Sequence, residues 1–155
     1  MNLNYEEFLD KIFEDIKEKG IDLSSAKLDH IAYQASSKED YQKYSEIFKK
    51  FAQLVKEPIV NGRRVGVFKF FIPLKYNDQS IEAIELIEPK EGQVAPSALE
   101  HAEFILDESL EEFMDKYPDL DWDTSSLNRD EFQHLKLKLS ENTQVKFPRK
   151  SLLGN

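Results

Sequence analysis

The sequence contains no cysteine among its 155 residues. Disulfide bonds and thiolate metal sites are therefore excluded, and any metal ion would have to be bound by histidine nitrogen and carboxylate oxygen atoms. Histidine is also scarce, with three in the chain, so few positions can supply a nitrogen ligand. The lack of cysteine is compatible with a reducing compartment, and we expect a cytoplasmic location.

The sequence also lacks the apolar run of about 20 residues that a transmembrane helix needs. Its formal net charge of −9 opposes binding to nucleic acid or to an anionic membrane, because both partners require a basic surface. No phosphate-binding loop, dinucleotide fingerprint, nucleophile elbow or HExxH motif occurs. The composition, 40% hydrophobic and 33% charged, is that of an ordinary globular protein. We expect a small-molecule ligand and a monomer or homodimer.

One short pattern occurs twice in the chain. Residues 28–33 and 99–104 both read leucine, acid, histidine, apolar residue, any residue, aromatic residue. Both segments have the composition of strands, so His30 and His101 hold the same place in two strands. The pattern predicts a duplicated unit whose copies present histidine to a shared centre.

The hydrophobic pattern predicts a similar order of elements in both halves. After an N-terminal helix, the first unit reads strand, helix and three strands. Its helix is expected to begin after a cap at Ser36 or Ser37 and carries apolar residues at helical spacing as far as Val55. Asn61-Gly62 marks a hairpin within this unit. The second unit repeats this order with fewer clearly marked strands. The expected strands cover residues 27–35, 58–60, 63–72, 81–89, 99–106, 131–139 and 143–149, and a further short strand is expected around residues 121–123.

Three residues could supply metal ligands from separate strands. Glu85 lies in the last strand of the first unit, and the two histidines lie in the first strand of each unit. If the two units pair with pseudo-symmetry, His30, Glu85 and His101 can meet. Two imidazoles and one carboxylate leave positions open for water and substrate, as a catalytic metal requires. A histidine in a strand is also commonly a hydrogen-bonded residue that binds no metal.

The segments DHIAY, IELIEP and LEHAEF resemble the first, fourth and fifth strands of the vicinal oxygen chelate superfamily. Residues 28–147, with the NGR hairpin and the closing VKFP, are similar to the YecM family. The resemblance implies an α+β fold in which two βαβββ modules form a curved mixed sheet, or cup, with an extra N-terminal helix. It implies one domain over residues 1–155, with the helix at 5–20 and the modules at 27–89 and 98–149.

The resemblance also implies a divalent metal ion held by His30, Glu85 and His101. The fourth ligand of the superfamily, a carboxylate in the final strand, falls on Lys146 in this sequence. A lysine ammonium cannot be a ligand, and His134 is the remaining nitrogen donor that could complete the site. Zinc, iron, manganese and nickel all suit imidazole and carboxylate donors.

Two functions are compatible with this pattern. In the first, the metal acts as a Lewis acid on a small anionic oxygenated metabolite, while Glu103 moves a proton and Lys146 stabilises the anion. An isomerase, a lyase and a dioxygenase all fit this description. In the second, the cup is a non-catalytic binding module for small molecules without a functional metal, which a lysine in a ligand position favours. A third interpretation is a plain interaction protein whose charged face is solvated.

Overall fold

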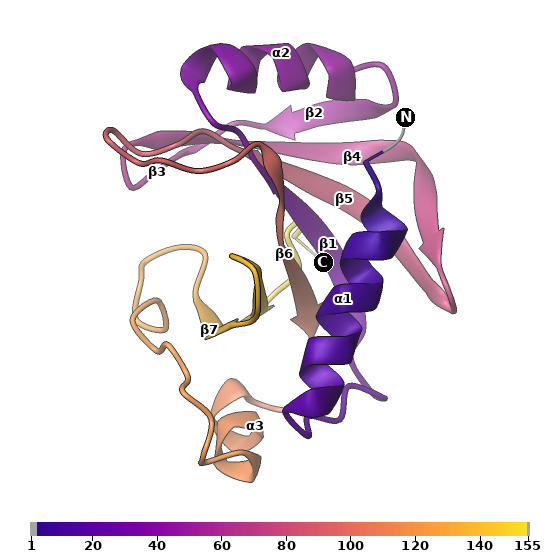
Figure 1. Ribbon diagram of the computed structural model, residues 1–155, viewed down its shortest axis with the longest axis vertical. Coiled ribbons are helices and arrows are strands. Elements are labelled where there is room, and N and C mark those ends of the chain that lie inside the picture. Colours follow the sequence, from indigo (N-terminus) through magenta and orange to yellow (C-terminus); the bar gives the residue numbers. More distant parts are fainter. Residues whose placement is uncertain (1–2, 155) are drawn as a thin grey trace. The chain divides into compact units, whose positions relative to one another are not determined.

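The computed structural model describes residues 3–154 as an α+β fold with three helices and eight strands. All eight strands belong to one mixed sheet, in the order β2-β4-β5-β1-β6-β8-β7 with β3 paired to β4. The α+β class, the mixed sheet and the N-terminal helix predicted from the sequence are thus confirmed. The elements in chain order are α1 (Tyr5–Glu18), β1 (Lys27–Gln34), α2 (Lys38–Phe48), β2 (Ala52–Lys56), β3 (Ile59–Val60), β4 (Arg63–Tyr76), β5 (Gln79–Ile87), β6 (Ala98–Ile105), α3 (Leu110–Lys116), β7 (His134–Lys138) and β8 (Gln144–Pro148) (Figure 1).

The described chain divides into two compact units. The first contains residues 30–100 together with Leu3, and the second contains residues 4–29 and 101–154. The N-terminal helix α1 therefore belongs to the second unit, where Phe13 meets Phe104 edge to face with 5.4 Å between ring centroids. The single domain over residues 1–155 and its module boundaries stay predictions.

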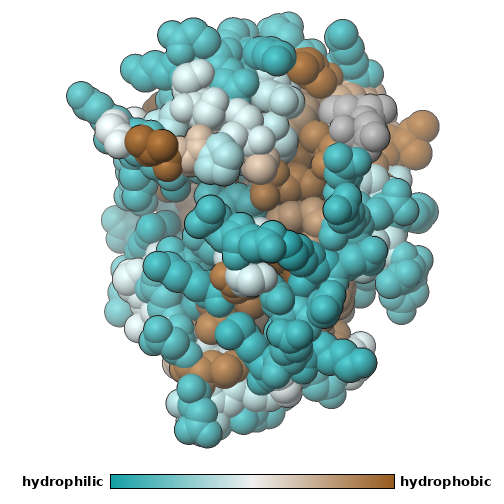
Figure 2. All heavy atoms as spheres, viewed as in Figure 1, coloured by the Kyte–Doolittle hydropathy of each residue, from teal (hydrophilic) through white to brown (hydrophobic). Residues whose placement is uncertain are grey.

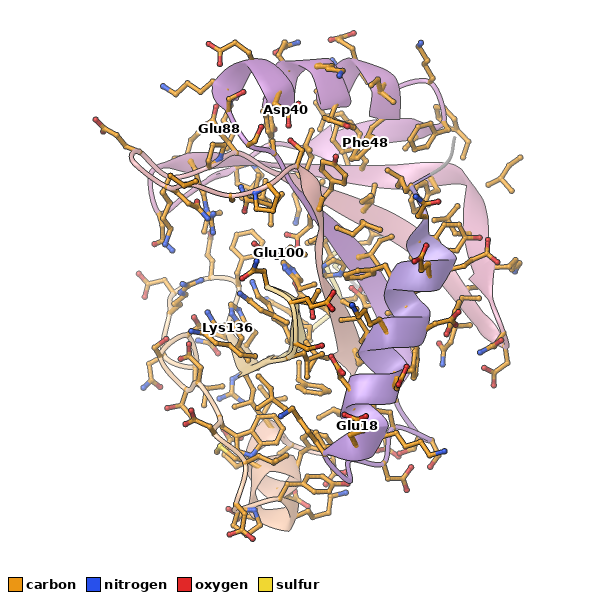
Figure 3. All side chains as sticks on the ribbon, in the orientation of Figure 1. Glu18, Asp40, Phe48, Glu88, Glu100 and Lys136 are labelled. Carbon is orange, nitrogen blue, oxygen red and sulfur yellow. The ribbon has the colours of Figure 1, made fainter. Side chains whose placement is uncertain are left out.

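In the first unit, helix α2 covers one face of the strands. The helix begins after Ser37, whose hydroxyl oxygen accepts a hydrogen bond from the Asp40 backbone N–H at 2.9 Å, so the predicted cap is present. Phe48 projects from α2 toward the sheet (Figure 3). Its ring is fully buried and lies 6.0 Å from the ring of Tyr33 and 5.4 Å from that of Phe68, centroid to centroid. These aromatic contacts attach the helix to strands β1 and β4.

The predicted second helix is too long at its C-terminal end. Helix α2 ends at Phe48, and the residues from Ala52 onward form strand β2. Strand β2 pairs in antiparallel fashion with β4, with Ala52 opposite Phe70. The apolar residues after Phe48 fit helical spacing, but the edge of β4 offers their backbone a ladder of hydrogen bonds. Pairing with a distant strand overrides the local pattern here.

In the second unit, aromatic side chains cover one face of β6 and β8. The rings of Phe104 and Phe147 lie 6.3 Å apart, and Phe113 of α3 packs on Phe147 at 4.9 Å between centroids. Side chains alternate between the two faces of a strand. His101 and Glu103 precede Phe104 by three positions and by one, so both lie on the opposite face of β6.

The second unit has fewer strands than the first. Between α3 and β7, the described chain forms no further strand, but Asp123 makes an isolated antiparallel bridge with Lys136 of β7. Two backbone hydrogen bonds form this bridge, with N···O distances of 2.8 and 3.2 Å. This single bridge takes the place of one strand of the βαβββ order, and Asp123 lies at the end of the short strand that the sequence predicted around residues 121–123.

Hydrophilic side chains dominate the face of the molecule shown in Figure 2. This surface is in keeping with a chain in which 33% of residues are charged. Among the described helices, none combines the length and the apolar composition that crossing a membrane requires.

Candidate metal centre

Two strands of the first unit bring a histidine and a carboxylate together. Strand β1 carries His30, strand β5 carries Glu85, and the two strands run parallel with Ala32 opposite Glu85. His30 Nε2 lies 3.0 Å from Glu85 Oε1, and both side chains are buried. Two of the three predicted metal ligands are therefore in contact within this unit.

The second unit contains a similar pair on a single strand. His101 and Glu103 are two residues apart on β6, so both side chains lie on the same face. His101 Nε2 lies 3.0 Å from Glu103 Oε2, and both residues are buried. The sequence suggested Glu103 as a proton carrier; in the structure it makes the contact with its histidine that Glu85 makes in the first unit.

The strand registers explain why the two carboxylates come from different strands. In the first unit, Glu85 of β5 lies opposite Ala32, two residues after the histidine of β1. In the second unit, Lys146 of β8 lies opposite Glu103, two residues after the histidine of β6. Lys146 is therefore the counterpart of Glu85, in agreement with the sequence prediction that a ligand position of the final strand falls on Lys146. The carboxylate of the second unit stands at the place that Ala32 occupies in the first.

The distance within each pair suits two ligands of one metal ion. Histidine nitrogen and carboxylate oxygen bind zinc at about 2.0–2.2 Å, so two such donors at a right angle lie about 3.0 Å apart. The observed distance is 3.0 Å in both pairs. It is also the length of an ordinary N–H···O hydrogen bond. Each pair can therefore be part of a metal site or a complete hydrogen bond.

His134, the remaining histidine, lies on β7 with its ring buried. Its Nδ1 is 2.8 Å from the carbonyl oxygen of Phe132, which can only accept, so Nδ1 carries the proton and Nε2 keeps a lone pair. Burial lowers the pKa of His134 to about 4, and the positive charge of Lys146 adds to this effect. The ring is therefore neutral at pH 7. Its predicted role as a fourth metal ligand stays a prediction.

The low pKa of His134 predicts that the fold is sensitive to acid. The pKa is about 6.5 when the ring is unperturbed and about 4 in the fold, so between these values the unfolded chain binds a proton that the folded chain does not. Stability therefore falls as the pH drops through this window, by up to about 3 kcal/mol, and this group causes no further loss below it. Urea unfolding in the presence of a chelator is expected to show a smaller loss for His134→Asn, which keeps a donor near Phe132 but cannot titrate. Equal losses in the two proteins would contradict this assignment.

Lys146 places a positive charge beside the second pair. Its side chain is half-buried and lies opposite Lys136 in the pairing of β7 with β8. Lys136 has a carboxylate oxygen of Asp123 at 3.3 Å, whereas the ammonium group of Lys146 makes no hydrogen bond or ion pair within residues 3–154. Alternation places this ammonium group on the face of the strands that also carries Glu103. An anionic ligand would be attracted to that face.

The comparison with known protein families agrees with the resemblance seen in the sequence. A model of the YecM protein family matches residues 1–150. The chain belongs to the YecM family. An uncharacterised protein of Haemophilus influenzae is 29% identical to this YecM chain over 104 residues, a match that covers 64% of the chain. The match covers 54% of the relative, so the chain spans about half the length of that protein.

Solved structures share the fold of this YecM protein. The structure of Protein EC4020 has a TM-score of 0.75 at 21% identity, and the match covers 95% of this chain and 84% of that one. A variant of Streptomyces coelicolor methylmalonyl-CoA epimerase in complex with 2-nitronate-propionyl-CoA has a TM-score of 0.57 at 13% identity, with coverage of 85% and 99%. At these identities the likeness shows the fold alone. The chain therefore has the fold of these two structures.

Proposed function

We propose that this YecM protein binds one divalent metal ion through His30, Glu85, His101 and Glu103. All four are buried residues with nitrogen or carboxylate donors that could hold a metal ion. The observation that carries the proposal is the repeated pair: each unit places a histidine Nε2 3.0 Å from a carboxylate oxygen. In the superfamily pattern the second carboxylate comes from the final strand, where this chain has Lys146. In the proposed centre, Glu103 supplies that carboxylate instead. His134 is not needed as a ligand.

The proposed reaction chemistry combines the ion with groups of the chain. Such an ion, when bound, supplies Lewis-acid polarisation of a carbonyl or of paired oxygen atoms in a small metabolite. Lys146 would attract the negative charge of that metabolite. The neutral Nε2 of His134 would accept a hydrogen bond or a proton from it. Burial of both pairs keeps water away and so strengthens each of these electrostatic interactions.

The identity of the ion would indicate the reaction class. Imidazole and carboxylate donors suit zinc, iron, manganese and nickel. Redox-active iron or manganese would favour a dioxygenase, whereas zinc or nickel would favour an isomerase or a lyase. The sequence expectations of a cytoplasmic location and of a monomer or homodimer accompany this proposal, and cell fractionation and light scattering would test them.

Metal analysis of the purified protein tests the proposed centre. Plasma emission spectrometry on untagged protein prepared without chelator is expected to find close to one divalent ion per chain. His30→Ala and His101→Ala are each expected to abolish it, because the single ion needs donors from both pairs. Metal that persists in either variant, or that falls by only half in each, would contradict a single centre.

A second function rests on the same distance between the paired atoms. Because 3.0 Å is also the length of a hydrogen bond, both pairs could be complete without metal, and the protein would then be a small-molecule binding module. Protein dialysed in turn against zinc, iron, manganese and nickel would take up none of them in that case. Native mass spectrometry for a retained small molecule would then separate a binding module from a plain interaction protein.

A further inference from the structure

Gln34 is a buried residue on the same strand as His30, and no sequence pattern singles it out. It follows His30 by four positions on β1, so the two side chains share a face, and it is 2% exposed. Its Nε2 donates hydrogen bonds to the carbonyl oxygens of Ala35 at 2.9 Å and Ile87 at 3.2 Å. Its Oε1 is buried and accepts no hydrogen bond from residues 3–154.

The orientation of the Gln34 amide is fixed by its two acceptors. A flipped amide would place its oxygen against two carbonyl oxygens, which cannot donate. A buried acceptor without a donor is destabilising, and buried polar atoms usually have a protein, water or ligand partner. The fold therefore holds an amide oxygen in place for a donor that does not come from the described chain.

The register of β1 and β5 gives the backbone spacing between Gln34 and the two residues of the first pair. Ala32 lies opposite Glu85, and Gln34 lies opposite Ile87, two residues further along both strands. Along the strands, Gln34 is therefore about 7 Å from the level of Glu85 and about 13 Å from His30. The neighbouring surface is apolar, because Ala32, Ile87 and Val65 form one buried cluster. The first unit thus presents metal donors, an apolar patch and a hydrogen-bond acceptor in succession.

We propose that Gln34 Oε1 recognises the far end of the ligand that binds at His30 and Glu85. The ligand class is a small metabolite with paired oxygens at one end, a short apolar middle that contacts Ala32 and Ile87, and a hydroxyl or amino group at the other end, about 7–13 Å from the pair. This inference rests on the proposed metal function. A site of this kind discriminates strongly, because a ligand without the donor leaves a buried acceptor unpaired.

Two ligands that differ in a single hydroxyl group test the role of Gln34. 2-Oxohexanoate and 6-hydroxy-2-oxohexanoate share the oxygen-bearing end and differ only at the far carbon. Isothermal titration calorimetry on the metal-loaded protein is expected to show at least about tenfold tighter binding of the hydroxylated compound. Gln34→Met keeps the length of the side chain, removes the amide oxygen and is expected to bind both compounds alike. Gln53→Met, at an exposed position of β2, is the matched control and should keep the preference.

The outcomes separate this inference from the metal proposal. Equal affinities in the metal-loaded wild type, or no binding of the hydroxylated compound, would overturn the role of Gln34 while the metal centre stands. Failure of the wild type to take up any metal would overturn both proposals. If the loss of its two carbonyl contacts prevents Gln34→Met from folding, the preference of the wild type decides alone.

Discussion

Replacement of Glu103 by glutamine is expected to weaken metal binding by at least about 100-fold. The variant Glu103→Gln keeps the size of the side chain but removes a negative charge from a buried position 3.0 Å from His101. A buried carboxylate ligand contributes both a bond to the ion and the charge that balances it, so its loss has a large effect. Competition between the metal-free protein and a fluorescent zinc chelator would measure the change in affinity.

The matched comparison for Glu103→Gln is the replacement of His134. The proposed centre leaves His134 outside the ligand set, so His134→Asn is expected to bind zinc about as tightly as the wild type. Both residues are buried, and neither replacement adds volume. A large loss of affinity in His134→Asn together with a small one in Glu103→Gln would make His134 the fourth ligand and return Glu103 to proton transfer.

The variant Phe48→Ala is expected to lower the free energy of unfolding by about 3–5 kcal/mol. Phe48 is fully buried and packs against the rings of Tyr33 and Phe68 from α2. Truncation would remove these contacts and leave a cavity between the helix and strands β1 and β4. Thermal unfolding followed by circular dichroism is expected to show a melting temperature about 10 °C lower.

An exposed phenylalanine of the same unit provides the control for this measurement. Phe71 lies on β4 and is 63% exposed. Phe71→Ala is expected to change the free energy of unfolding by no more than about 0.5 kcal/mol, since it removes little buried area. Similar losses in the two variants would show that burial against α2 does not determine the stability of this unit.

Local sequence patterns predicted much of the fold because they have local physical causes. Ser37 caps α2 as expected, since a serine hydroxyl accepts a hydrogen bond from a backbone N–H in the first turn. Asn61-Gly62 forms the predicted hairpin between β3 and β4, and both residues adopt the positive φ angles, 52° and 80°, that such a turn requires. Strand β1, with its histidine, was recognisable from strand composition and from the repeated hexapeptide.

Features that depend on the distant chain could not be predicted in the same way. Residues 52–56 form strand β2 because they pair with β4. The Gln34 oxygen has no donor because the amide nitrogen is the atom turned toward the Ile87 carbonyl oxygen. The contact of Glu103 with His101 was visible only in part. The second hexapeptide carries an acid where the first has Ala32, but the register of β6 with β8 was needed to see that Lys146 takes the place of Glu85.

The second unit has Lys146 at the position where the first unit has Glu85. This difference determines which ligand charge the proposed centre would prefer. In the first unit, Glu85 contributes one formal negative charge, whereas in the second unit the charge of Glu103 is cancelled by the neighbouring Lys146. With a divalent ion bound in the proposed centre, the ion and these three side chains would together carry a net formal charge of +1. A monoanion would neutralise that charge, and a dianion of the same shape would bury an excess negative charge, which is costly. In the proposed centre, the lysine would thus favour monocarboxylates over dicarboxylates.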